Sequence, residues 1–194
     1  MGDIVIIVHN YIPKLMDADD ATYIERLTQI SRSLSLNRPA PFDMFVTSSI
    51  QHAAMALVKD SQRNVLLRQL NQLDLAQIGE DALSRLRELL PTPIAHLQLH
   101  ILPAMASSAG GVSMAPGHIL VCLRSDAWST ERLQRNVAHE YSHGVRQSQK
   151  PQLTEFGFGE AVPYTVRDFL VFEGLAMILA DTLYPAPISP EPVS

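Results

Sequence analysis

The chain has 194 residues, of which 46% are hydrophobic, and carries a formal net charge of −5 at pH 7. This length can bury a sizeable core as one domain. The acidic balance, without a dense run of lysine and arginine, disfavours nucleic acid and anionic membranes as partners. A single cysteine excludes an internal disulfide framework. No stretch approaches the roughly 18 apolar residues of a membrane-spanning helix, and the apolar run at 4–8 is too short for a signal-peptide core. We therefore expect a cytoplasmic protein.

The first half of the chain is predicted to be mainly helical. Residues 4–8 form a continuous β-branched run, which is typical of a buried strand. Residues 17–35 have an amphipathic pattern with Asp19 and Asp20 near the start, which predicts a helix. The region 42–90 is helical in composition, and the prolines that follow it end this helical part.

The second half is predicted to hold a small sheet or β-ribbon followed by two helices. Residues 96–102 alternate polar and apolar side chains, which indicates a half-buried strand, and a glycine-containing turn leads to a second strand at 118–123. Ser129 opens a helix with an acid in its first turn and an apolar stripe at every fourth residue. That stripe consists of Leu133, Val137, Tyr141 and Val145. Residues 165–183 form a second, strongly apolar helix. Because the alternating strand argues against an all-α fold, the expected class is α+β.

The middle of the first of these two helices contains an H-E-x-x-H motif. It consists of His139, Glu140 and His143 with two residues between the last two. Histidines four residues apart project from one helical face, so their imidazole nitrogens can meet one tetrahedral zinc ion (Zn²⁺). The glutamate between them can then act as general base on the zinc-bound water. The alternative is a pair of surface histidines on an ordinary amphipathic helix. The motif indicates a zinc hydrolase, most often a peptidase.

A third metal ligand decides between these two interpretations. The metzincin extension would need Gly at 146 and His at 149, but the chain has Arg146 and Gln149, which excludes that subclass. The remaining common arrangement takes a glutamate from a second helix. Glu155 and Glu160 are weaker candidates, because they lie in a glycine-containing segment that we expect to be solvated.

Glu173 is the preferred third ligand. It is a single carboxylate within the apolar helix 165–183, and such a group is costly to bury without a partner. Gly174 and Ala176 beside it would permit close approach of the two helices. The alternative is a half-exposed glutamate on an amphipathic helix.

The sequence around these residues resembles a known family. Residues 136–146 read Asn-Val-Ala-His-Glu-Tyr-Ser-His-Gly-Val-Arg, and residues 172–176 read Phe-Glu-Gly-Leu-Ala. This pairing of H-E-x-x-H-x-x-R with E-G-L-A is similar to the pattern of the predicted zinc-dependent protease family, which is mostly bacterial and gluzincin-like. The glycines at 110 and 111 and the strand at 119–123 also fit the turn and strand that precede its metal helix.

The resemblance covers residues 90–183 and implies a fold and a set of site residues. It implies His139, His143 and Glu173 as zinc ligands, Glu140 as the catalytic carboxylate, and a zincin-like two-helix metal core. Together with the predicted elements, this gives one α+β domain over residues 1–184. Its helical part spans 1–90 and its metal-site part 91–184, and the proline-rich tail at 185–194 is not expected to fold.

The chain departs from the family pattern at Met177. The family often has an aspartate four residues after the ligand glutamate, where it can orient a ligand histidine through its second nitrogen. Such partners typically change metal affinity or activity by about 10- to 100-fold. A backbone carbonyl or Asp181, one turn further on, could substitute.

The expected function is hydrolysis of a peptide or protein substrate by a zinc-dependent metallopeptidase. The alternative is a zinc-binding regulatory or interaction domain with little or no catalysis. An exposed strand, either 119–123 or the segment around 111–114, could hold an extended peptide by backbone pairing. His96, His100 and His118 are expected to be surface histidines of the sheet rather than ligands. The reaction also needs a hydrogen-bond donor to the oxyanion that forms from the carbonyl, and this donor could be Tyr164, His118 or Arg146.

Overall fold

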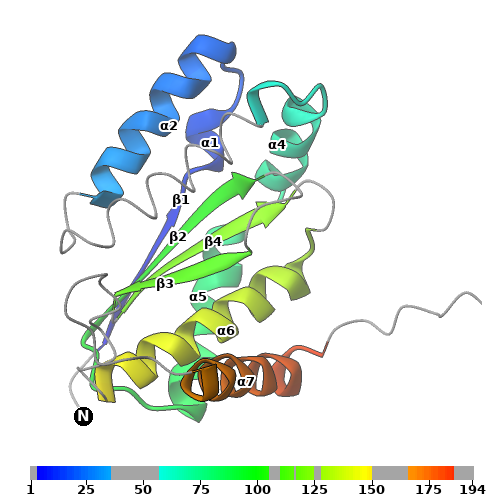
Figure 1. The fold of residues 1–194 in the computed structure, drawn as a ribbon. Coiled ribbons are helices and arrows are strands. Elements are labelled where there is room, and N and C mark those ends of the chain that lie inside the picture. Colours follow the sequence, from blue (N-terminus) through cyan, green and yellow to red (C-terminus); the bar gives the residue numbers. More distant parts are fainter. Residues whose placement is uncertain are drawn as a thin grey trace, which may run out of the picture.

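A four-stranded sheet forms the centre of the protein (Figure 1). The structure, a computed structural model, describes residues 4–35, 57–104, 110–115, 117–124, 128–149 and 166–185. The strands are β1 (Val5–Asn10), β2 (His96–Ala104), β3 (Gly111–Ala115) and β4 (His118–Arg124), in the order β1-β2-β4-β3. β2 pairs in parallel with both β1 and β4, whereas β3 is antiparallel to β4 and lies at the edge.

Helices precede and follow the sheet strands. They are α1 (Ile12–Leu15), α2 (Asp20–Ser35), α4 (Arg63–Asn71), α5 (Leu75–Leu89), α6 (Thr130–Gln149) and α7 (Val166–Leu183). The backbone N–H of Arg132 donates to the Ser129 hydroxyl at 3.1 Å, so the predicted cap does begin α6. The α+β class is confirmed. None of the helices in the described ranges is long and apolar enough to cross a membrane.

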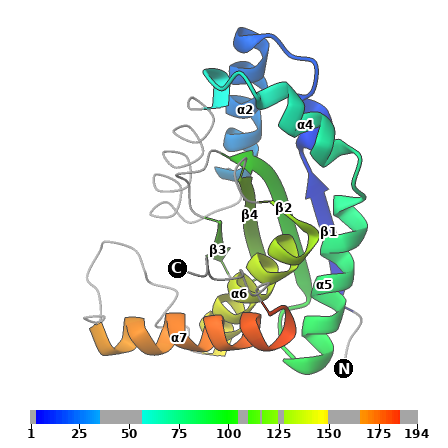
Figure 2. The same cartoon turned by 90° about the vertical axis from the view of Figure 1, so that its right-hand side faces the viewer.

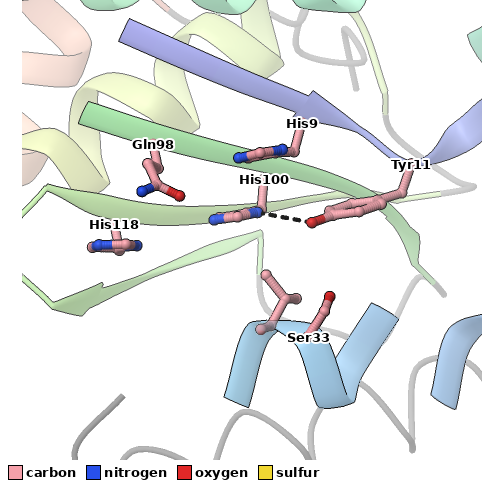
Figure 3. A pocket seen from close by; sticks show the side chains of 7 residues that line it. His9, Tyr11, Ser33, Gln98, His100 and His118 are labelled. Carbon is pink, nitrogen blue, oxygen red and sulfur yellow. Dashed lines mark hydrogen bonds between the residues drawn. The ribbon is translucent and has the colours of Figure 1, made fainter. Parts of the chain in front are cut away.

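The two faces of the sheet have different coverings. One face packs against α5 and α6. The backbone of α5 approaches the sheet closely at Gly79, where an added Cβ would lie 2.6 Å from a Leu99 methyl carbon. Because side chains alternate along a strand, His9 and His100, which are paired across β1 and β2, point to the opposite face. At one end of that face lies α2 (Figure 3).

Two predictions about strand burial were wrong. Residues 4–8 were expected to be buried, but Val5 and Ile7 of β1 are 45% and 39% exposed. β1 is an edge strand, and these two side chains point to the face away from α5. The strand predicted to be half-buried at 96–102 is instead the central β2, which is paired on both sides and buried over most of its length.

The N-terminal part of the chain is also joined to the metal-site part more closely than the sequence indicates. β1 contributes to the same sheet as β2 and β4, which places both parts around one core. The Tyr141 hydroxyl of α6 donates to the Leu90 carbonyl after α5 at 2.8 Å. The segments 42–56 and 186–194, for which a helical part and a tail were predicted, lie outside the described residues.

Candidate metal centre

The packing of α6 sets the direction in which its histidines point. The predicted stripe of Leu133, Val137, Tyr141 and Val145 is buried, as expected, in the common core. A helix that buries this stripe presents His139 and His143 together, one turn apart, on a neighbouring face. That face lies against α7 (Figure 2).

Small residues bring α7 close to α6. Ala176 and Ala180 are 0% and 1% exposed, and they permit the close approach that the sequence assigned to Ala176. The same role for Gly174 was wrong, since nothing within the described residues lies within 4 Å of a Cβ added there. Part of the predicted apolar surface of this helix is exposed rather than buried, at Leu175, Met177 and Ile178.

Three potential metal ligands meet between these helices. His139 Nε2 and His143 Nε2 are 3.0 Å apart. Glu173 Oε2 lies 3.2 Å from His139 Nε2, and Glu173 Oε1 lies 3.5 Å from His143 Nε2. Zinc bonds to such atoms are about 2.0–2.1 Å long, so a tetrahedral ion requires donors about 3.3 Å apart. The observed separations fit that requirement, and this is the one group of its kind within the described ranges.

Both histidines are in the protonation state that metal binding needs. Burial is the main cause that lowers the pKa of His143 to about 3, and the neighbouring His139 and Arg146 lower it further. Burial also lowers the pKa of His139, although the nearby Glu173 carboxylate partly opposes this shift. Neutral imidazoles at pH 7 have lone pairs available for a cation.

The aromatic ring of Phe172 lies flat against His143. The ring centroids are 4.0 Å apart and the planes are inclined by only 11°. The Arg146 guanidinium carbon lies 5.5 Å from the centroid of the same phenyl ring. This stacking restrains the imidazole plane of His143, a candidate metal ligand, and sequence reasoning did not assign such a role to Phe172. Its position next to Glu173 was the available signal.

Hydrogen bonds to the second nitrogen of His143 are absent within the described residues, where the buried Nδ1 atom has no partner. Met177, at the position of the family aspartate, is 50% exposed. Asp181, the predicted substitute, instead forms an ion pair with Arg135. Within the described residues, the contact that restrains the His143 ring is therefore the stacking with Phe172 rather than a hydrogen bond to Nδ1.

Glu140, which follows His139 in α6, lies against the edge strand β3. The side chain is 7% exposed, and it accepts a hydrogen bond from the backbone N–H of Ser113. Burial raises the pKa of Glu140 to about 8, with a further contribution from Glu173, while the Ser113 bond opposes the shift. A Cβ at Gly111 would lie 2.9 Å from Glu140 Cγ, so glycine is required for this approach. The contacts of Gly111 and Ser113 with Glu140 were not predicted.

The remaining candidates lie elsewhere. His100 and His118 point to the opposite face of the sheet, and His96 is exposed, so none of the three joins the metal group. Their placement removes His118 as a possible oxyanion donor. Tyr164, Glu155 and Glu160 lie outside the described residues. Of the two possible substrate strands, β4 is internal, which leaves β3.

Two imidazoles from α6 and one carboxylate from α7 form a group that could bind a single metal ion. Residues 77–188 match the family model described as predicted Zn-dependent protease (DUF2268), which covers more than half of the chain. The chain belongs to this family. No curated protein and no solved structure matches this chain.

Proposed function

We propose that this protein is a zinc-dependent peptidase, with His139, His143 and Glu173 as metal ligands and Glu140 as general base. The observation that carries the proposal is the convergence of the three donor groups at 3.0, 3.2 and 3.5 Å. Without a cation, the imidazoles could donate hydrogen bonds to the carboxylate only by protonating the nitrogen atoms that converge here, which lie 3.0 Å from each other. With zinc, all three are satisfied.

Zinc, when bound, lowers the pKa of a coordinated water and polarises the carbonyl of the substrate. Glu140 would accept a proton from the water that attacks the carbonyl carbon, and it would pass this proton to the amine nitrogen as the C–N bond breaks. In the metal-free protein its pKa is raised to about 8, and a divalent cation nearby would lower it again, which gives the carboxylate that a base requires. The bond that Ser113 donates to Glu140 would hold the carboxylate in position.

An extended peptide is the substrate that fits the surroundings of Glu140. β3 is the edge strand beside α6, and within the described residues no strand pairs with its outer side. Such an edge can bind a peptide by backbone hydrogen bonds, with Gly111 and Ser113 bringing it next to Glu140. A peptide seated there would have its backbone close to the metal group.

A second candidate function is zinc-dependent stabilisation or regulation with little catalysis. The observation that favours it is that no described residue forms a hydrogen bond with His143 Nδ1, because such bonds typically support metal affinity and activity. In this case the same three residues would bind zinc, but Glu140 would have no catalytic role.

Metal analysis and a peptide digest distinguish these functions. The full chain, purified without added metal, is analysed for zinc and then incubated with a peptide library with and without a chelator. One zinc per chain and chelator-sensitive cleavage are expected. Stoichiometric zinc without cleavage would support the regulatory alternative. No zinc, together with no change in thermal unfolding when zinc is added, would overturn both.

A further inference from the structure

A second cluster of histidines lies on the sheet face opposite the metal group. Neighbouring strands β1, β2 and β4 each contribute one imidazole to a pocket of about 180 Å³, with α2 as its far wall (Figure 3). The lining consists of His9, Tyr11, Ser33, Leu34, Gln98, His100 and His118. No part of the proposed peptidase mechanism uses this pocket.

The imidazoles of this cluster stand in a row. The His9 and His100 rings are nearly parallel, at 7°, with centroids 4.6 Å apart. His118 continues the row at 6.4 Å and 11° from His100. The rings therefore turn their faces to one another and direct their edges, which carry the nitrogen atoms, outward from the stack. Ring edges suit a ligand that forms hydrogen bonds better than an aromatic ligand that would stack.

The same geometry disfavours a metal ion. An imidazole binds a metal in the plane of its ring, along the nitrogen lone pair, and parallel rings keep these directions parallel. Within the described residues, the donor atoms of His9, His100 and His118 do not form a group that could hold one ion. The ligand has a different chemistry.

Several of the lining side chains can donate hydrogen bonds. A histidine ring donates from at least one nitrogen in either protonation state, and the Gln98 amide offers two further N–H groups. The Tyr11 hydroxyl and His100 Nδ1 are hydrogen-bonded at 3.1 Å, which fixes that ring. The Ser33 hydroxyl donates to the Ile30 carbonyl at 2.7 Å and so forms part of the wall. None of the seven lining residues is acidic.

We propose that this pocket binds a small oxyanion, namely a phosphate or carboxylate group. Such a group accepts several hydrogen bonds at once, and the His9 ring and the Gln98 amide can both donate to it. The pocket volume has room for one group of this size and for part of a molecule that carries it. His9 and Gln98 are the principal contacts, because they come from adjacent strands on the same face.

Calorimetric titration of the metal-free full chain tests this proposal, with inorganic phosphate and acetate as separate probes. Saturable binding of at least one probe is expected, with shifts in the nuclear magnetic resonance (NMR) ring signals of His9. Tighter binding of phosphate than of acetate would identify a phosphate group as the source, and the reverse would identify a carboxylate. His9→Phe keeps the aromatic stack but removes the donor, and should weaken binding about tenfold.

Gln98→Met provides a second test that does not disturb the row of rings, and it too should weaken binding about tenfold. His96→Gln is the matched control, because His96 lies exposed on the same face of β2 outside the pocket. It should bind both probes as the unmodified chain does. Thermal unfolding shows whether each variant is folded. No saturable binding of either probe, or unchanged affinity in both the His9 and Gln98 variants, would overturn the proposal.

Discussion

Two histidine pairs in this protein have the same separation and different relative orientations of their rings. The ring centroids of His139 and His143 are 4.6 Å apart with an interplanar angle of 87°. Those of His9 and His100 are also 4.6 Å apart, but with an angle of 7°. Histidines four apart on a helix can rotate until their nitrogens converge, whereas in-register residues on parallel strands stand side by side. The backbone therefore decides whether two imidazoles can share one ion.

The neighbours of each pair extend this difference. Glu173 places a carboxylate within 3.5 Å of both helix histidines, which completes a group that suits a cation. The strand histidines adjoin an amide and a phenol, and none of the described residues that line the pocket is acidic. We therefore expect the two faces of one sheet to bind ligands of opposite charge.

The largest expected effect is on turnover, and it tests whether the helix pair serves catalysis. Glu140→Gln should lower peptide hydrolysis by about 10²- to 10⁴-fold, because a general base contributes that much. The variant should retain one zinc per chain, since Glu140 is not a proposed ligand. Glu88→Gln, an exposed residue of α5, is the control. Unchanged turnover in the Glu140 variant would remove the assigned base.

Loss of one imidazole from the helix pair and of one from the row of strand histidines compares the two clusters directly. His143→Ala should weaken zinc binding by more than about 100-fold, since even residues outside the ligand set typically change affinity by about 10- to 100-fold. His118→Ala, on the other face, should leave zinc affinity unchanged. Competition with a chromophoric chelator measures both. Equal losses in the two variants would contradict the separation of the two sites.

The sequence predicted the helix cluster and not the strand cluster, for a physical reason. The spacing of His139, Glu140 and His143 is local, and helical geometry alone brings them to one face. Glu173 followed from the cost of burying a carboxylate in an apolar helix. The neighbours of His9 depend on the pairing of β1 with β2. His9 and His100 are far apart in the sequence, and most of the helical N-terminal part lies between them. No local pattern encodes that pairing.

The same distinction explains the errors in burial. The apolar run at 4–8 reads equally well as a central or an edge strand, and only the order β1-β2-β4-β3 decides between them. The alternation in β2 reflects His96, Gln98 and His100, whose face is lined by polar groups of the pocket rather than by solvent alone. The contact of Gly111 with Glu140 is likewise a property of the packed edge strand.

The stability of the metal-free protein should depend on pH through the metal face. An unfolded glutamate ionises near pH 4.5, whereas the pKa of Glu140 in the folded protein is raised to about 8. Between these values the folded protein holds a proton that the unfolded chain has lost, so stability falls as pH rises. Glu140→Gln should therefore be on the order of 4 kcal/mol more stable than the unmodified chain at pH 8, with little difference below pH 5. Urea unfolding without metal measures this, and parallel pH curves for the two proteins would contradict it.

The smallest expected effect concerns how the helix pair is held without the usual hydrogen bond. Phe172→Leu removes the ring that stacks on His143 at 4.0 Å and should weaken zinc binding about tenfold, comparable to losing a polar partner of a ligand. Phe172→Tyr keeps the ring and should bind zinc normally. Leu175→Ala, at an exposed position of the same helix, controls for general effects on α7. If Phe172→Leu and Leu175→Ala bind zinc equally well, stacking does not orient the ligand. The visible spectrum of the cobalt-substituted protein separates the two cases further, because a reoriented imidazole changes the ligand field whereas a uniformly less stable fold does not.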